Sequence, residues 1–314
     1  MILKAFRGLK QAGVLGMNSR NADYIMRCNP RSFFPLVDDK LLTKKRSESF
    51  QIPTPALYCV VDRYGDVAGF QAALRGICQF AVKPARGSGG SGIILIRDCA
   101  EKGYISQSGE LISLQNLVYH ISDILSGVYS LSGLEDRAIL EALIHPDPVF
   151  DAVSYQGVPD IRIVVYRGVP VMAMVRLPTK ASDGKANLHR GAIGAGIELN
   201  RGTTITAVHR SRVVGNHPDT GKPVGGIQVP YWEKMLWIAA RSFEMTGLGY
   251  IGVDLVIDRD RGPLLLELNA RPGLAIQLAN RKGLKERLNQ IDQAPAEVFA
   301  TAEARVGWAR KTFM

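Results

Sequence analysis

The 314-residue sequence lacks several features that would assign it to a special class of protein. It has no run of about 18 consecutive apolar residues, so we expect no membrane-spanning helix. Its start is basic and amphipathic but lacks the long apolar stretch of a signal peptide. No internal repeat and no low-complexity segment occurs, which argues against repeat and disordered architectures. The sequence therefore favours a cytoplasmic globular protein, whose basic start is compatible with contact to a membrane surface.

Cysteine is scarce, and its spacing excludes two common uses. No two of the four cysteines, Cys28, Cys59, Cys78 and Cys99, form a Cys-x-x-Cys pair. The sequence thus carries neither a zinc-ligand pattern nor a thioredoxin-like redox motif. Scattered cysteines in a cytoplasmic enzyme are usually reduced, so we expect free thiols, although the sequence does not exclude a disulfide.

The composition is that of a folded protein with an excess of positive charge. Hydrophobic residues make up 46% and charged residues 22% of a chain that is long enough for one large or two ordinary domains. Lys and Arg number 39 against 29 Asp and Glu, so the net charge is +10. Such an excess favours anionic partners, namely nucleotides, acidic peptides, nucleic acid or anionic lipid, without choosing among them.

Apolar periodicity and chain breakers predict helices and strands in both halves of the chain. Helices are predicted over 41–50, 69–78, 114–128, 231–246 and 295–310. Strands are predicted over 56–61, 79–84, 93–97, 161–167, 169–176, 250–258 and 263–269, and 138–144 forms a short apolar run. Strands clustered with helices between them predict an α+β architecture with more than one subdomain.

A glycine-rich run follows the strand that carries Lys83. It contains Gly-x-Gly-x-x-Gly at Gly87, Gly89 and Gly92, but a strand follows it, whereas a dinucleotide-binding fingerprint needs a helix there. Two interpretations remain equally open. The run is a plain hairpin loop, or its backbone N–H groups and the Lys83 charge bind phosphate oxygens.

Two carboxylates and an amide lie in otherwise apolar predicted strands. Glu267 and Asn269 are two residues apart, so they point to one face, and Asp254 on the neighbouring strand can join them. Oxygen ligands of this kind suit Mg²⁺. The alternative is a buried carboxylate paired with an arginine, because an unpaired buried charge is costly.

A third group of polar residues lies between these two regions. Its members are Asp160, Arg162, Arg176, Lys185, Asn187, His189 and Arg190. Individually they read as surface charges, and His189 as a hydrogen-bonded histidine, not a base. Arg162 and Arg176 differ because they lie within apolar strands.

Taken together and in order, these stretches resemble the ATP-grasp superfamily, and within it the RimK-type alpha-L-glutamate ligase-like proteins. The resemblance runs from about residue 39 to 273, through DDKLLTKKRSESFQIPTP, VKPARGSGGSGI, ILEALI, DIRIVV, NLHRG, GVDLV and LELNARPG. It implies an ATP-grasp fold, with two α+β subdomains clasping the nucleotide. The segments would be a short N-terminal stretch over 1–45, a small subdomain with the glycine-rich loop over 46–140, and a C-terminal subdomain with the metal site over 141–314.

The resemblance also implies a role for each site residue. Lys40 and Lys83 would match the two nucleotide lysines. The nucleotide would further meet the loop residues Gly87, Ser88, Gly89, Gly90, Ser91 and Gly92, the hinge residues Glu141, Ala142, Leu143 and Ile144, and Asn187. Asp254, Glu267 and Asn269 would hold Mg²⁺, with Mn²⁺ as an alternative. Arg162, Arg176 and Arg190 would stabilise developing charge, and Arg271 would either clamp an oxyanion or pair with an acid.

The implied activity is that of an ADP-forming carboxylate–amine ligase that passes through an acyl phosphate. Its partners would be ATP, an acidic small-molecule or peptide carboxylate and an amino-acid amine, with glutamate as the first candidate, a protein acceptor as an option, and a homo-oligomer compatible with the sequence. The alternatives are a phosphotransferase, an ATP-grasp enzyme associated with sugar transfer, and a non-enzymatic polyanion-binding protein. The last would need basic residues clustered among aromatics, as for nucleic acid, whereas the basic residues here are dispersed.

Overall fold

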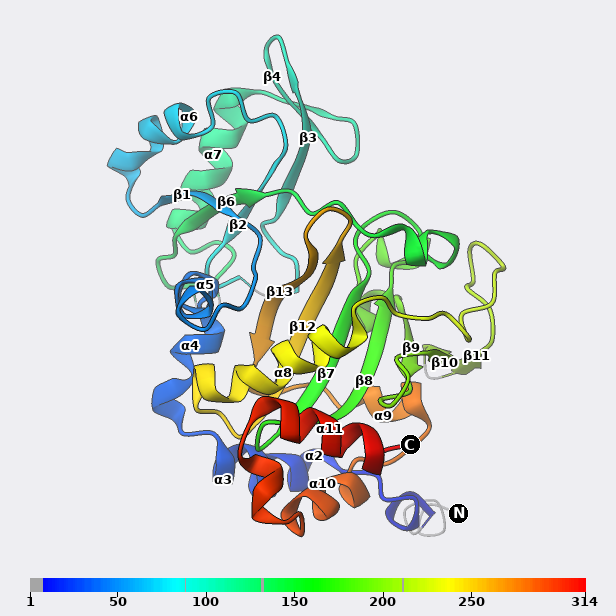
Figure 1. Cartoon of the computed structure of the whole chain (residues 1–314). Coiled ribbons are helices and arrows are strands. Elements are labelled where there is room, and N and C mark those ends of the chain that lie inside the picture. The colour runs from blue at the N-terminus through cyan, green and yellow to red at the C-terminus, as the bar shows by residue number, and fades with distance from the viewer. Residues whose placement is uncertain (1–7, 88, 131–132, 211) are drawn as a thin grey trace. The chain divides into compact units, whose positions relative to one another are not determined.

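The computed structural model describes residues 8–87, 89–130, 133–210 and 212–314, and it confirms the α+β class (Figure 1). The chain forms two compact units, each described here by itself. The small unit contains Asp39–Lys45 and Thr54–Ile144, and the large unit contains Met1–Asp38, Arg46–Pro53 and His145–Met314. The segment over 1–45 is thus divided between the units, and the run from Glu141 to Ile144 ends the small unit.

The small unit is built on an antiparallel sheet. Its described strands, in their order across the sheet, are β1 (Leu57–Val61), β6 (Ala138–Ala142), β2 (Phe80–Pro84), β3 (Ile94–Ala100), β4 (Gly103–Ser106) and β5 (Leu111–Ile112). The helical segments are the start of α5 (Lys40–Ser49), a 3-10 helix (Tyr64–Gly69), α6 (Phe70–Ala73) and α7 (Leu114–Leu125). The helix predicted over 69–78 is therefore shorter than expected, since the chain turns at Gly76, whose φ is +79°.

The two faces of this sheet have different partners. Phe80 and Val82 of β2 share an apolar cluster with Ile121 of α7. Because side chains alternate along a strand, Lys83 points to the opposite face. On that face Leu41 of α5 packs against Ile139 of β6.

Cys78 and Cys99 form a disulfide beyond the paired residues of the β2–β3 hairpin. The expectation of reduced thiols is therefore wrong for this pair, whereas Cys28 and Cys59 are free. The hairpin register pairs Phe80 with Ile96, which brings the two cysteine Cα atoms to 4.8 Å. Sequence spacing alone does not show this proximity, because it depends on how the strands align.

Reduction of this disulfide is expected to lower the free energy of unfolding by about 3 kcal/mol, from loop-closure entropy over its 21-residue separation. Urea unfolding followed by circular dichroism, with and without dithiothreitol, measures the change. The double variant Cys78→Ser/Cys99→Ser should unfold at the same urea concentration as the reduced wild type, with or without dithiothreitol. Cys59→Ser should still lose stability when dithiothreitol is added. Identical curves for the oxidised and reduced wild type would contradict the prediction.

The large unit contains a second antiparallel sheet, which carries the candidate metal residues. Its described strands, in their order across the sheet, are β11 (Arg212–Val214), β10 (Thr204–His209), β9 (Ile193–Ile197), β8 (Val169–Leu177), β7 (Asp160–Tyr166), β12 (Tyr250–Asp258) and β13 (Gly262–Asn269). Its longer helices are α8 (Trp232–Thr246), α9 (Ala275–Asn280), α10 (Lys285–Asp292) and α11 (Ala302–Thr312), and its short 3-10 helices are Pro148–Val153, Lys180–Ser182, Leu188–Arg190 and Ala296–Phe299. Figure 1 shows α8 lying against the sheet, where it contacts β7, β8 and β12.

Two predicted features of this unit are confirmed in detail. Gly168 joins β7 to β8 in a hairpin with a φ of +77°, and Gly247 ends α8 with a φ of +68°. The terminal helix predicted over 295–310 is instead a 3-10 helix followed by α11.

No helix in the described ranges combines the length and the apolar character needed to cross a membrane.

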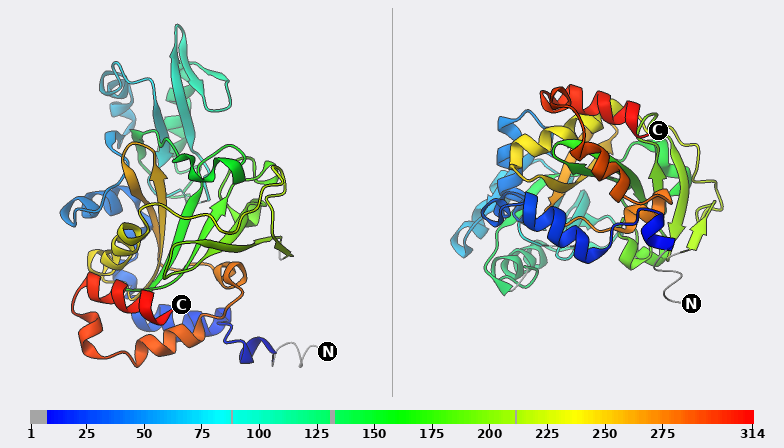
Figure 2. Two further views of the ribbon diagram at one scale, coloured as in Figure 1. Left: turned by 45° about the vertical axis from the view of Figure 1, so that its right-hand side comes forward. Right: turned by 90° about the horizontal axis from the view of Figure 1, so that it is seen from below.

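The N-terminal segment packs into the large unit and supports the site strands. It contains α2 (Met17–Ser19), a π-helix (Arg20–Ile25), α3 (Met26–Cys28), a 3-10 helix (Arg31–Phe33) and α4 (Pro35–Asp38). Figure 2 shows it beside α10, where the Lys285 N–H donates to the Gly13 carbonyl at 3.0 Å. The buried Asn29 amide donates to the carbonyls of Tyr250 at 2.7 Å and Ala270 at 3.0 Å. Asn29 therefore ties together the start of β12 and the residue that follows β13.

Candidate functional site

A buried cluster of three charged residues lies on the sheet of the small unit. Lys83 on β2 and Glu141 on the adjacent β6 are 5% and 2% exposed, and Lys44 on α5 is 4% exposed. The Lys83 Nζ atom lies 2.5 Å from Glu141 Oε1, and the Lys44 Nζ atom lies 2.9 Å from Glu141 Oε2. The second contact is an ion pair without hydrogen-bond geometry. Two ammonium groups face one carboxylate, so the buried cluster carries a net charge of +1.

The charge state of Glu141 follows from this environment. Burial alone would raise its pKa, but the neighbouring Lys83 and Lys44 ammonium groups outweigh burial and lower the pKa. Glu141 is therefore ionised at neutral pH. Both of its carboxylate oxygens face lysines, so its side chain is held within the cluster.

The glycine-rich loop is held at its base by polar contacts. The Lys40 ammonium donates a hydrogen bond to the carbonyl of Gly87. The Asp136 carboxylate accepts from the Arg86 N–H at 2.9 Å and from the Ser130 hydroxyl at 2.8 Å. These bonds hold the base of the loop and place the Lys40 ammonium beside it.

Glycine is required in the loop for two different reasons. A Cβ atom on Gly87 would lie 2.2 Å from Pro84, and one on Gly92 would lie 2.5 Å from Tyr129. Gly90 has open space around it but a φ of +76°, and the φ of Gly89 is +62°. Of the other predicted residues, Ser91 is exposed, Ala142 ends β6, Leu143 and Ile144 follow it, and Ser88 lies outside the described residues.

A second charged cluster is centred on Asp254 in the large unit. Asp254 is fully buried, and Arg162 from β7 donates to both of its oxygens at 2.7 and 2.6 Å. Arg176 from β8 donates to Asp254 Oδ2 at 2.8 Å and to Asp160 Oδ2 at 2.5 Å. The arginine pairing that the sequence analysis left open is thus realised for Asp254.

The pKa values of the two carboxylates of this cluster are shifted in opposite directions. Burial would raise the pKa of Asp254, but Arg162 and Arg176 hold it well below its usual range. Burial raises the pKa of Asp160. The Arg176 guanidinium acts against this rise, and the negative charge of Asp254 adds to it. Asp254 is therefore the firmly ionised member of the pair.

Glu267 and Asn269 join Asp254 on one face of the sheet, as predicted. The register places Glu267 directly opposite Asp254. The Asn269 amide Nδ2 lies 3.1 Å from Asp254 Oδ2 and 3.4 Å from Glu267 Oε1. Rotation of the Asn269 amide by half a turn would exchange its nitrogen and oxygen and bring three oxygen ligands to one point.

The donor types fit a hard divalent cation such as Mg²⁺. The carboxylates of Asp254 and Glu267 converge with the side-chain amide of Asn269, whose nitrogen faces them, and the lowered pKa of Asp254 keeps that carboxylate ionised between Arg162 and Arg176. Within the described residues, no group of three or more His, Cys, Asp or Glu side chains is arranged to hold a metal. A cation here would therefore depend on the Asn269 oxygen in addition to the two carboxylates.

The remaining predicted residues lie elsewhere in the large unit. The Asn187 side chain accepts from the His189 N–H at 3.0 Å and so begins the 3-10 helix that contains the exposed Arg190. Arg271 is exposed, and its guanidinium lies 5.1 Å from the centre of the Phe34 ring. The structure thus brings Arg162 and Arg176 to Asp254, and among the described contacts none joins Arg190 or Arg271 to it.

Sequence reasoning missed two residues that organise these clusters. Lys44 lies four residues after Lys40, so both can occupy one helix face, and this spacing was the available signal. Asp136 precedes the strand that carries Glu141, but no local pattern distinguishes it from a surface carboxylate. Both roles depend on contacts between segments distant in sequence.

Comparison with known proteins adds a family match. The model of a family described as sugar-transfer associated ATP-grasp matches residues 19–293. A probable alpha-L-glutamate ligase of Pectobacterium carotovorum is 31% identical over 115 residues, which cover 37% of this chain and 27% of that protein. The aligned part is thus well under half of that relative.

Solved structures are similar at a lower level. D-alanyl-alanine synthetase A from Vibrio cholerae is 12% identical, with a TM-score of 0.48 over 84% of this chain and 65% of the other. A RimK-domain ATP-grasp protein from Sphaerobacter thermophilus is 16% identical, with a TM-score of 0.45 over 84% of this chain and 70% of the other. At these scores the structural likeness adds no argument to the sequence match.

Proposed function

Because the chain belongs to the sugar-transfer associated ATP-grasp family, we propose that it is an ATP-dependent ligase that joins a carboxylate to an amine. The superfamily expected from the motifs is confirmed, and the matched family is the sugar-transfer group that the sequence analysis kept as an alternative. One structural observation carries the nucleotide part of the proposal. Lys83 lies at a glycine-rich hairpin loop, in a buried cluster whose net positive charge suits an anion such as phosphate.

The proposed reaction has two steps. An oxygen of the substrate carboxylate attacks the γ-phosphorus of ATP, and the bond from that phosphorus to the β-phosphate oxygen breaks. The products of this step are ADP and an acyl phosphate. The amine nitrogen then attacks the acyl carbon, loses a proton and expels inorganic phosphate. Mg²⁺, when bound at Asp254, Glu267 and Asn269, would neutralise charge on the phosphate oxygens.

The residues of the chain contribute positioning and charge to this reaction. Lys83 and Lys40 would bind phosphate oxygens, and the loop would exclude the water that hydrolyses acyl phosphates. Arg162 and Arg176 hold Asp254 in its ionised form. Arg190 and Arg271, which are exposed, would grip the substrate carboxylate or the transferring phosphoryl group through their planar guanidinium forks.

Glutamate, or a peptide ending in glutamate, is the first candidate for a substrate. It is supported by the name of the Pectobacterium carotovorum relative over the aligned 115 residues. The family description supports a second candidate, which is a carboxylate or amine carried on a sugar. A uronic acid and an amino sugar represent these two chemical classes.

Hydroxylamine trapping tests the ligase proposal. We expect pure protein with MgATP, a suitable acid and hydroxylamine to form a hydroxamate together with ADP and phosphate, because an acyl phosphate is electrophilic at carbon. The acids to compare are glutamate, a glutamate-terminated peptide and a uronic acid, each with and without amino-acid and amino-sugar amines. A stable phosphorylated product without hydroxamate would replace the ligase with a phosphotransferase. Absence of ATP turnover with every acid would refute both.

Loss of the Lys83 ammonium is expected to weaken ATP binding. Lys83→Ala should cost about 1.5–3 kcal/mol of binding free energy, the usual value for a charged hydrogen bond. Lys40→Ala should also weaken binding, through the loop that Lys40 holds. Calorimetric titration with a non-hydrolysable ATP analogue measures both effects, and unchanged affinity in both variants would remove the lysines from the site.

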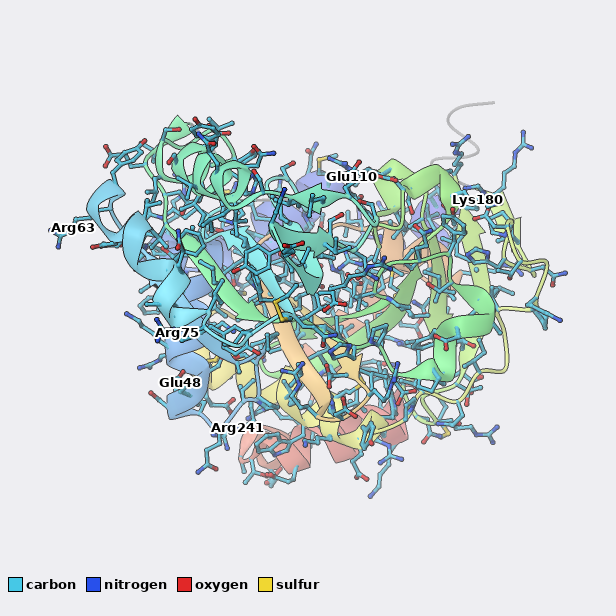
Figure 3. All side chains as sticks on the ribbon, turned by 90° about the horizontal axis from the view of Figure 1, so that it is seen from above. Glu48, Arg63, Arg75, Glu110, Lys180 and Arg241 are labelled. Carbon is cyan, nitrogen blue, oxygen red and sulfur yellow. A yellow bond between two sulfur atoms is a disulfide. The ribbon has the colours of Figure 1, made fainter. Side chains whose placement is uncertain are left out.

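Polyanion binding without catalysis is the competing class. Figure 3 shows exposed side chains of both signs, among them Arg63, Arg75, Glu48 and Glu110, projecting from separate elements. Acidic residues interspersed with basic ones disfavour a continuous basic face of the kind that binds nucleic acid. Binding of a random DNA duplex at physiological salt, without ATP turnover, would support this class.

A further inference from the structure

Lys44 is a buried lysine for which the proposed function has no role. Its ammonium lies 2.9 Å from Glu141 Oε2 and 3.4 Å from the Thr54 hydroxyl, and it donates to the Pro55 carbonyl. Only 4% of the residue is exposed. Burial of a charged lysine is costly unless the charge is paired, so this position calls for an explanation.

The negative charge of Glu141 is unexpected beside a lysine that is proposed to bind phosphate. Its carboxylate lies 2.5 Å from the Lys83 ammonium, which the proposed function assigns to a phosphate group. A lone Lys83–Glu141 pair would be neutral and would offer a phosphate no net attraction. Lys44 changes this balance, because it faces the second oxygen of the same carboxylate.

We propose that Lys44 is a positioning residue of the nucleotide site, which balances the Glu141 carboxylate so that the Lys83 ammonium retains a net positive charge for phosphate. This inference rests on the proposed function. In this arrangement Glu141 holds Lys83 in place with one oxygen, and Lys44 compensates the charge of the carboxylate. Lys44 acts through Glu141 and needs no contact with the nucleotide.

Lys40, one helical turn earlier, has a different task. Its ammonium bonds to the Gly87 carbonyl at the base of the loop, whereas that of Lys44 faces Glu141. Two lysines on one helix thus serve the loop and the charge cluster separately. Loss of Lys44 should therefore change the electrostatics around Lys83 without removing the bond between Lys40 and the loop.

Charge rescue tests this inference. Lys44→Met makes the cluster neutral and should weaken binding of a non-hydrolysable ATP analogue with Mg²⁺ by at least about tenfold. The double variant Lys44→Met/Glu141→Gln restores a net charge of +1 on Lys83 and should recover most of the lost affinity. Lys44→Arg should stay closer to the wild type than Lys44→Met. Lys45→Met, which removes an exposed charge from the same helix, is the matched control.

The outcomes separate this inference from its alternatives. A purely structural Lys44 predicts that the double variant binds no better than Lys44→Met, and that result would overturn the inference. Equal affinity of the wild type and Lys44→Met would overturn it too, while the proposed function would stand. Failure of the wild type to bind the analogue would reject both. If circular dichroism shows that Lys44→Met does not fold, Lys44→Gln with and without Glu141→Gln gives the same comparison.

Discussion

Replacement of Glu267 by glutamine is expected to lower ATP-dependent product formation by at least about a hundredfold, the scale for loss of one preorganised electrostatic group. The substitution keeps the shape of the side chain and removes the negative charge from the proposed Mg²⁺ site. The fold should persist, because Glu267 is only partly buried and its contact with the Asn269 amide is long, at 3.4 Å. ADP release at saturating ATP, together with a thermal unfolding curve, measures the two effects.

Asp260→Asn is the matched control for this experiment. Asp260 is exposed in the turn between β12 and β13, so its substitution removes one carboxylate from the same hairpin but away from the proposed ligands. It should leave ADP release unchanged. Raising the Mg²⁺ concentration should partly restore the rate of ADP release by Glu267→Gln, because a higher concentration of the ion fills a site that binds it more weakly. Near-normal turnover by folded Glu267→Gln would remove Glu267 from the metal site.

Replacement of Asp254 by asparagine is expected to destabilise the large unit by about 3–5 kcal/mol, the range for breaking a buried ion pair from one side. Asp254 is completely buried and accepts three bonds from Arg162 and Arg176. Loss of the Asp254 charge leaves the Arg162 guanidinium without the carboxylate to which its Nε and Nη2 groups donate. Urea unfolding at neutral pH measures the loss.

A second substitution separates the buried-charge effect from a general packing defect. Arg162→Met in the Asp254→Asn background removes the guanidinium that has lost its partner. The double variant should therefore be more stable than Asp254→Asn alone, because it no longer buries an unpaired guanidinium. The effects of the two substitutions on the free energy of unfolding should then be non-additive, as expected for residues in contact. Additive losses in the double variant would show that packing, not the unpaired charge, dominates. Glu267→Gln should show no comparable loss of stability.

The convergence of Asp254, Glu267 and Asn269 could be predicted because it depends on local geometry. A period of two along β13 sets Glu267 and Asn269 on one face, and the short polar turn after β12 makes the two strands neighbours. Hairpins such as β7–β8 and β12–β13 were predictable for the same reason. Local steric rules and short connections determine these features.

The arginine partners of Asp254 could not be predicted from the sequence. Arg162 and Arg176 lie 92 and 78 residues away, and they reach Asp254 only because the sheet places β8, β7 and β12 side by side. Many lateral orders are compatible with the same predicted strands. The order is selected by burial of the whole apolar sheet, not by the charged residues themselves.

The sequence by itself determined the α+β class, the motifs that place the chain in the ATP-grasp superfamily, and the face shared by the candidate metal residues. Only the tertiary structure decided that Cys78 pairs with Cys99, that Lys44 faces Glu141, and that Asp254 is held by two arginines. The physical reason is the range of the interactions. Backbone sterics and side-chain alternation act over a few residues, whereas ion pairs and disulfides form between groups that the packing of distant segments brings within bonding distance.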